Sequence, residues 1–169
     1  MSPGRLLDLG AGHGKFSLIG KELGWDVTAV DVRTVRMPMV EGIRWIEADV
    51  RTFDVSGYDC IALLGVLYHL GLADQRELLR RCAPTPTILD THHSIRPVIT
   101  VDGYEGHLYR EPGSNFEELA QVATASFGNP ESFWASREAL DRMLHEAGFK
   151  TVLALEPPYL PDRTFYLCL

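Results

Sequence analysis

The sequence has few of the features that mark metal-binding or nucleic-acid-binding proteins. Three cysteines occur in 169 residues, widely separated and without a CxxC or Cys/His ligand pattern. We therefore expect buried or free thiols in a reducing compartment and no zinc site. Sixteen Lys and Arg against 23 Asp and Glu give a net charge of -7 with no basic block. The phosphate-driven affinity of most nucleic-acid-binding proteins is therefore not expected.

Long apolar runs are also missing. No run approaches the roughly 18 residues that a membrane span requires. Met1 leads within a few residues to the first predicted strand, which leaves no space for a signal peptide. We expect a cytoplasmic protein without membrane contact. The remaining composition, 46% hydrophobic and 23% charged, predicts a single globular domain over residues 1–169.

The most informative motif in the sequence is LLDLGAGHG at residues 6–14. It reads as a strand that runs into a cofactor-binding turn. Glycines at positions 10, 12 and 14 let the backbone turn sharply, adopt positive φ and approach a ligand without an intervening Cβ. Apolar residues at helical spacing follow between 15 and 23, so a helix should begin beside the glycines.

Two acids follow the next two predicted strands. Asp31 ends the strand 26–31 and lies 21 residues after Gly10, the spacing of an acid that accepts hydrogen bonds from a ribose diol. A simple turn aspartate is the structural alternative. Asp49 follows the strand 43–48 and is placed to meet an adenine amino group, with Val50 offering its N–H and an apolar face. Alternatively, Asp49 caps the turn over 50–53.

The rest of the chain continues as an alternating α/β pattern with one interruption. Residues 33–42 are too short and broken for a helix, and residues 60–64 read as a central strand covered on both faces. Residues 95–133 break the alternation and are predicted to form a lid, with a hairpin around Asp102 and Gly103. The other predicted elements are a helix opened by a capping box from Asp74 to Glu77, a strand 87–90, a helix 116–125, a helix 136–147 capped by Gly148, and antiparallel strands 151–155 and 164–169.

The acid-x-Gly-x-Gly-x-Gly motif from Asp8 to Gly14, with Asp31, Asp49 and a fourth strand ending at Leu64, resembles the class I S-adenosylmethionine-dependent methyltransferases. The resemblance implies a Rossmann-like α/β fold with a seven-stranded, mostly parallel sheet and an antiparallel last strand, into which residues 95–133 insert the predicted lid between the fifth strand and the final helix. It also implies S-adenosyl-L-methionine as cofactor. The cofactor-binding residues that it implies are Asp8, Gly10, Ala11, Gly12, Asp31, Val32, Asp49, Val50 and Leu64.

The absence of several known motifs after the fourth predicted strand limits the class of methyl acceptor. The Asn/Asp-Pro-Pro-aromatic motif of amino-methylating DNA enzymes, the paired glutamates of arginine methyltransferases and a Pro-Cys nucleophile are all absent. These absences leave oxygen or nitrogen atoms of small molecules as the methyl acceptors, and of these two we predict an oxygen. Residues 65–69 also resemble enzymes that carboxymethylate a wobble uridine in transfer RNA, in which a tyrosine at the position of Tyr68 helps to bind a carboxylated cofactor. A cofactor-binding protein without transferase activity is the third possibility.

Candidate catalytic groups follow the fourth and fifth strands. His69, His92 and His93 are each placed to take a proton from a hydroxyl, and Tyr68 lies beside them. Local hydrogen bonding that shapes loops is their structural alternative. A metal held by Asp90 with His92 or His93 is an alternative that a single acid beside two adjacent histidines does not favour, and no metal is predicted. The residues of the lid region and its end that are expected to face the substrate are Tyr104, Tyr109, Arg110 and Trp134.

Overall fold

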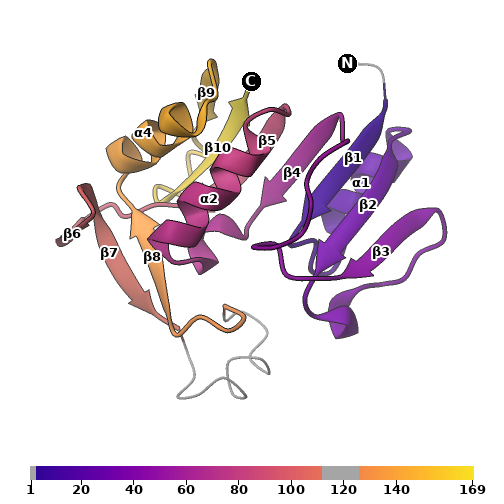
Figure 1. Ribbon diagram of the computed structural model, residues 1–169, viewed down its shortest axis with the longest axis horizontal. Helices are drawn as coiled ribbons and strands as arrows, with labels where there is room; N and C mark the ends of the chain where they lie inside the picture. Colours follow the sequence, from indigo (N-terminus) through magenta and orange to yellow (C-terminus); the bar gives the residue numbers. More distant parts are fainter. Residues whose placement is uncertain (1–2, 112–125) are drawn as a thin grey trace.

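The computed structural model describes residues 3–111 and 126–169, which form two β-sheets with three α-helices (Figure 1). The larger sheet has the strand order β3-β2-β1-β4-β5-β10-β9, in which the first five strands are parallel and β10 is antiparallel to both of its neighbours. Its strands are β1 (Arg5–Leu9), β2 (Asp26–Asp31), β3 (Ile43–Glu47), β4 (Cys60–Leu64), β5 (Thr87–His92), β9 (Val152–Leu155) and β10 (Arg163–Cys168). The predicted sheet and its antiparallel last strand are confirmed.

The helices cover the two faces of this sheet unequally. Behind the sheet in Figure 1 lies α1 (Lys15–Glu22), whereas α2 (Leu72–Cys82) and α4 (Arg137–Ala147) lie in front. The core on the α2 and α4 side is the larger and includes fully buried Leu7, Leu63 and Tyr166, while the core under α1 is small. The crossover over 33–42 contains only the single turn η1 (Thr34–Arg36), as its sequence predicts. No helix in the described part of the chain is long and apolar enough to cross a membrane.

The insertion after β5 forms the second sheet, in the order β6-β7-β8. Its strands are β6 (Ile99–Val101), β7 (Tyr104–Arg110) and β8 (Glu131–Ala135). The predicted hairpin is confirmed, because Asp102 and Gly103 form its turn with φ of 48° and 83°. Strand β8 is not among the predicted elements. It contacts the larger sheet's domain through a hydrogen bond of 3.0 Å from Phe133 N to Leu70 O. The helix predicted over 116–125 lies outside the described residues.

The cap predicted at Gly148 is confirmed, and a glycine ends α1 in a similar way. Gly24, in the left-handed region just after α1, donates its N–H to the Lys21 carbonyl, and Gly148 ends α4 in the same region. The predicted capping box of α2 is wrong. The helix begins earlier, at Leu72 behind Gly71, so Asp74 lies inside the first turn instead of capping it, and no side chain caps this end.

Candidate functional site

A cavity of about 640 Å³ lies at the carboxyl ends of the parallel strands, where open α/β sheets bind ligands. The loops after β1, β2, β3 and β4 form one side, and the single turn η2 (Leu67–His69) and the insertion form the other. The predicted cofactor-binding residues that line it are Gly10, Ala11, Gly12, Asp31, Val32, Asp49, Val50 and Leu64. The topology therefore brings eight of the nine predicted residues to one cavity.

The glycine turn after β1 is shaped by close backbone contacts. Gly10, Gly12 and Gly14 all have positive φ, between 53° and 74°. A Cβ at Gly10 would lie 2.8 Å from the side chain of Val66, whereas one at Gly12 would meet nothing within 4 Å. The turn therefore leaves open space directly over Gly12, beside the first residues of α1.

Asp31 ties the glycine turn to the end of β2. One carboxylate oxygen accepts from Gly12 N at 2.9 Å, and the other accepts from Arg33 N at 2.8 Å. Each carboxylate oxygen can accept a second hydrogen bond. The Asp31 carboxylate therefore shapes the cavity wall and keeps acceptor capacity toward the cavity.

Asp8, the ninth predicted residue, is not among the described residues that line the cavity. Its side chain is buried between β1 and α1 and accepts a hydrogen bond of 2.5 Å from the Ser17 hydroxyl. Burial raises the pKa of Asp8 from 3.8 to about 6, against the lowering effect of the hydrogen bonds from Ser17. The acid of the motif therefore bonds to α1 rather than facing the cavity.

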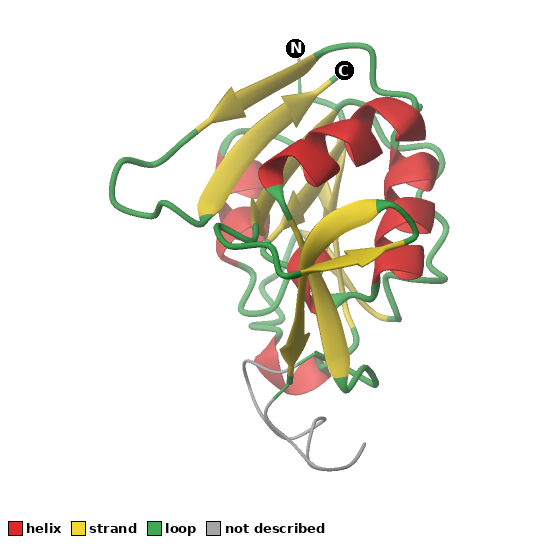
Figure 2. Ribbon diagram, turned by 90° about the vertical axis from the view of Figure 1, so that its left-hand side faces the viewer, coloured by secondary structure: helices red, strands yellow, loops and turns green. Residues whose placement is uncertain are grey.

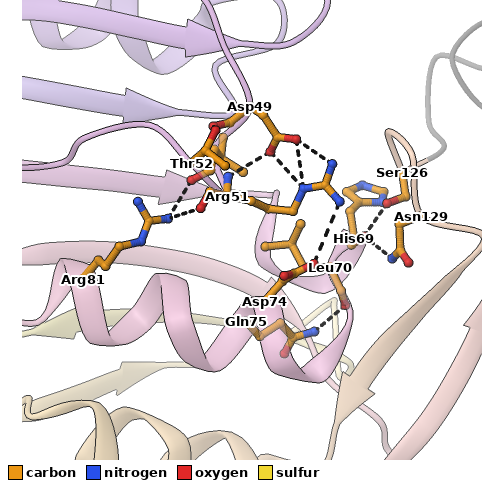
Figure 3. Close-up of polar contacts among 11 residues, drawn as sticks. Asp49, Arg51, Thr52, His69, Leu70, Asp74, Gln75, Arg81, Ser126 and Asn129 are labelled. Carbon is orange, nitrogen blue, oxygen red and sulfur yellow. Dashed lines mark hydrogen bonds and ion pairs between the residues drawn. The ribbon is translucent and has the colours of Figure 1, made fainter.

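Asp49 is held by its neighbour Arg51 (Figure 3). The guanidinium donates to both carboxylate oxygens, from Nε to Oδ1 at 3.0 Å and from Nη2 to Oδ2 at 2.5 Å, and the backbone N–H of Arg51 also donates to Oδ1. Burial opposes ionisation, yet the hydrogen bonds from Arg51 lower the pKa of Asp49. Arg81 of α2 fixes the same loop from below by donating to the carbonyls of Val50, Arg51 and Phe53. Asp49 thus caps its turn, as the structural alternative predicts, and also lines the cavity.

Aromatic rings form the opposite wall. The Trp134 ring lies between His92 and Tyr109, nearly parallel to both, with centroids 5.0 Å and 5.1 Å away. Tyr68 meets His92 and Trp134 edge-on. All four side chains line the cavity. The structure therefore places two of the four predicted substrate-facing residues, Tyr109 and Trp134, at the site.

The other two, Tyr104 and Arg110, lie elsewhere. Tyr104 is buried against α4, where its hydroxyl donates to Glu146 and its ring contacts the guanidinium of Arg142. Arg110 is exposed at the end of β7. Side chains alternate between the two faces of a strand, so Tyr104 and Arg110 point away from the face that carries Tyr109. The structure therefore does not bring Tyr104 and Arg110 to the described lining of the cavity.

His69 lies on the cavity wall and contacts a buried carboxylate that sequence reasoning missed. Its Nδ1 is 3.4 Å from Glu111, which is 2% exposed and also accepts hydrogen bonds from Ser126 N at 3.0 Å and from the Ser132 hydroxyl. Burial alone would raise the pKa of Glu111, but the hydrogen bonds from His69, Ser132 and Ser126 lower it. The insertion therefore supplies an ionised carboxylate to the imidazole. A single acid beside a strand end carries no sequence signal for this role.

The same insertion binds the backbone of His69. The Ser126 hydroxyl and the Asn129 amide, at 2.9 Å, both donate to the His69 carbonyl (Figure 3). Ser126 and Phe127 also line the cavity, and the Phe127 ring lies 5.6 Å from the guanidinium of Arg33 at the end of β2. The insertion therefore borders the cavity on both the β2 and the β4 side, as expected of a lid.

The remaining histidines differ from each other. His92 lines the cavity, and its Nδ1 lies 2.9 Å from Asp162. His93 does not line it; the backbone N–H of His93 donates to the Asp162 carbonyl, and burial lowers the pKa of its imidazole. Asp90 is fully buried and bound at both oxygens by Arg163, at 2.7 Å and 2.5 Å. Asp90 therefore has an arginine partner, and no group of three potential metal-ligating side chains occurs in residues 3–111 and 126–169.

Comparisons with solved structures give close matches to the whole fold. The N-terminal domain of EvdMO1, crystallised with S-adenosylhomocysteine and D-fucose, matches with a TM-score of 0.78 at 23% identity, over 98% of this chain and 74% of that one. The 1,6-didemethyltoxoflavin-N1-methyltransferase of Burkholderia thailandensis matches with a TM-score of 0.66 at 20% identity, over 98% of this chain and 70% of that one. Human N-acetylserotonin methyltransferase matches with a TM-score of 0.64 at 16% identity, over 97% of this chain and 46% of that one.

Sequence comparison gives one informative result. A search of curated proteins finds no significant match. A family model described as a methyltransferase domain matches residues 1–85, half of the chain, which contain the glycine turn, Asp31, Asp49 and the end of β4. The chain therefore belongs to this methyltransferase-domain family and is an enzyme with the class I, Rossmann-like methyltransferase fold.

Proposed function

We propose that the protein transfers a methyl group from S-adenosylmethionine to a hydroxyl of a small molecule, with His69 as the general base. One observation carries the proposal: a single cavity has the glycine turn, Asp31 and Asp49 on one side and the His69–Glu111 pair with the aromatic rings on the other. Structural neighbours were crystallised with small molecules, D-fucose for EvdMO1 and 1,6-didemethyltoxoflavin for the Burkholderia enzyme.

The cavity suits a nucleoside cofactor that carries an amino-acid tail. Asp31 would accept hydrogen bonds from the ribose hydroxyls, Val32 would pack on the adenine, and the Asp49 carboxylate and the Val50 N–H would bind the adenine edge. The open space over Gly12 admits the methionine part, and the Leu64 carbonyl accepts from its amino group. When bound, S-adenosylmethionine supplies an electrophilic methyl group on a positively charged sulfur.

His69 fits the base role better than His92. Its Nδ1 faces Glu111, whose side chain is 1% exposed, and this leaves Nε2 for the acceptor. In the transfer, Nε2 of His69 would take the proton of the acceptor hydroxyl as the hydroxyl oxygen receives the methyl group. The buried carboxylate then stabilises the resulting imidazolium. The partner of His92, Asp162, is 35% exposed, so water screens that pair more strongly.

Calorimetry tests the cofactor part of the proposal without any acceptor. S-adenosylhomocysteine should bind the wild-type protein and bind Asp31→Ala at least about tenfold more weakly, the effect of losing about one charge-assisted hydrogen bond. Asp26→Ala, at the exposed start of the same strand, is the matched control and should bind normally. No binding by the wild-type protein would refute the proposal.

A transfer assay with labelled S-adenosylmethionine tests the acceptor and the base. Panels of hydroxylated small molecules, amines and transfer RNA separate oxygen, nitrogen and nucleic-acid acceptors. With the acceptor found, His69→Ala should lower kcat by about 10² to 10⁴, the usual contribution of a general base, while cofactor affinity is unchanged. His92→Ala serves as the comparison. A larger loss in His92→Ala would reject His69 as the base, and methylation of transfer RNA alone would reject the small-molecule acceptor.

A further inference from the structure

Arg51 binds the Asp49 carboxylate as a fork at the wall of the cavity (Figure 3). Its Nη2 donates to Oδ2 at 2.5 Å, and its Nε lies 3.0 Å from Oδ1 and 2.9 Å from Oδ2. Contacts of this kind fix the orientation of both planar groups. The side chains of Arg51 and Asp49 are 27% and 29% exposed, so both remain open to a ligand. The carboxylate is therefore held in one orientation beside the space where a ligand binds.

The backbone of this loop is fixed without the Arg51 side chain. The Asp49 carbonyl accepts from Thr52 N at 3.1 Å and from Phe53 N at 3.0 Å, and Arg81 of α2 donates to three carbonyls of the loop. None of these bonds comes from the three-stranded sheet of the insertion, which lies toward the viewer in Figure 2. What the Arg51 side chain adds is therefore the orientation of the Asp49 carboxylate, independently of the acceptor side of the site.

We propose that Arg51 is a positioning residue that makes this edge of the cavity select a purine with an amino group at C6 over one with a keto group there. The inference rests on the proposed function, which places the adenine edge at Asp49 and Val50. Adenine offers an amino donor at C6 and an acceptor at N1, whereas hypoxanthine offers a keto acceptor and an N1–H donor. Within residues 3–111 and 126–169 the Val50 N–H has no hydrogen-bond partner, so it is available as a donor. An acceptor at Asp49 and a donor at Val50 match adenine and oppose hypoxanthine at both positions.

The fork makes this selection depend on Arg51. A carboxylate without the fork would turn away from a keto oxygen and so escape the repulsion between two acceptors. In the structure Nε and Nη2 donate to Asp49, so a purine at this edge meets the carboxylate oxygens and not these donors. A binding site built around hydrogen bonds strongly rejects a ligand that leaves its polar groups unmatched. We therefore expect the wild-type protein to bind S-adenosylhomocysteine at least about a hundredfold more tightly than S-inosylhomocysteine, its hypoxanthine analogue.

Calorimetry with these two compounds on the full chain tests the inference, and the quantity compared is the ratio of their Kd values. Arg51→Met keeps an unbranched side chain but no fork, and it should lower the ratio at least about tenfold. Arg51→Lys keeps the charge without the fork and should give an intermediate ratio. Arg81→Met is the matched control. It removes the bonds to the loop carbonyls, so it should weaken binding of both compounds alike and leave the ratio unchanged.

Asp49→Ala tests the same pair from the other side. Loss of the carboxylate releases the Arg51 guanidinium to donate to a keto oxygen, so this variant should also lower the ratio at least about tenfold. The double variant Asp49→Ala/Arg51→Met has no such donor and should show a smaller change than Asp49→Ala. Circular dichroism checks that each variant is folded. An unchanged ratio in Arg51→Met, with S-adenosylhomocysteine still bound, would overturn this inference alone. No binding of S-adenosylhomocysteine by the wild-type protein would refute the proposed function and this inference with it.

Discussion

The buried carboxyl of Asp8 should cost the protein stability at neutral pH, and Asp8→Asn measures that cost. Burial raises the pKa of Asp8 from 3.8 to about 6. The folded chain therefore holds this proton more tightly than the unfolded chain does. The contribution of Asp8 to the free energy of unfolding is most favourable below pH 4. It decreases as the pH rises from 4 to 6 and does not change further above that range. A rise of about two units in this pKa lowers the free energy of unfolding by about 3 kcal/mol above pH 7 and by about half of that at pH 5.

Asparagine retains an oxygen that accepts from the Ser17 hydroxyl but carries no charge. We expect Asp8→Asn to raise the free energy of unfolding by about 3 kcal/mol at pH 7.5 and by about 1.5 kcal/mol at pH 5. Urea unfolding followed by tryptophan fluorescence gives both values. Asp26→Asn, on an exposed strand end, should change neither. A destabilised Asp8→Asn, or an effect equal at both pH values, would refute the reasoning.

Three further outcomes follow from other contacts. Arg163→Ala leaves Asp90 buried without its partner and should lower the free energy of unfolding by about 3 kcal/mol in urea titrations, whereas Arg80→Ala, an exposed ion-pair partner, should change nothing measurable. Gly10→Ala, whose new Cβ would lie 2.8 Å from a neighbouring side chain, should lower Tm and S-adenosylhomocysteine affinity more than Gly12→Ala, which has open space; equal effects would contradict the packing. The three buried cysteines should react with a thiol reagent only on unfolding, since burial raises their pKa values; rapid reaction of the native protein would exclude this.

The sheet and one side of the site were predictable because local signals determine them. Alternating strands and helices give the parallel order, and the ends of parallel strands meet at one edge. The glycine turn and the acids ending at Asp31 and Asp49 therefore reach the same cavity. Asp8 is the exception: whether a motif acid faces a ligand or a helix depends on a contact with Ser17, which spacing does not reveal.

The opposite side of the site depends on pairings within the insertion. Tyr104, Tyr109 and Arg110 are equally plausible from the sequence, and only the strand register assigns them to different faces. Glu111 becomes a partner of His69 because β7 and β8 bring it beside η2, 42 residues away along the chain. The prediction of a capping box was wrong for a similar reason. Helix α2 begins directly after η2, where β8 bonds to the Leu70 carbonyl, and this start lies before the polar residues that predicted it.

The hydrogen bonds between the insertion and His69 have a consequence for engineering and for evolution. Ser126 and Asn129 bind its carbonyl while Glu111 faces its imidazole, so under the proposed function the part that would contact the acceptor also aligns the proposed base. Exchanging the insertion for that of another methyltransferase would leave the His69 carbonyl and imidazole without these partners. New acceptor ranges should therefore arise by point changes on the aromatic wall, at Tyr109 or Trp134, more readily than by transplanting the insertion as a module.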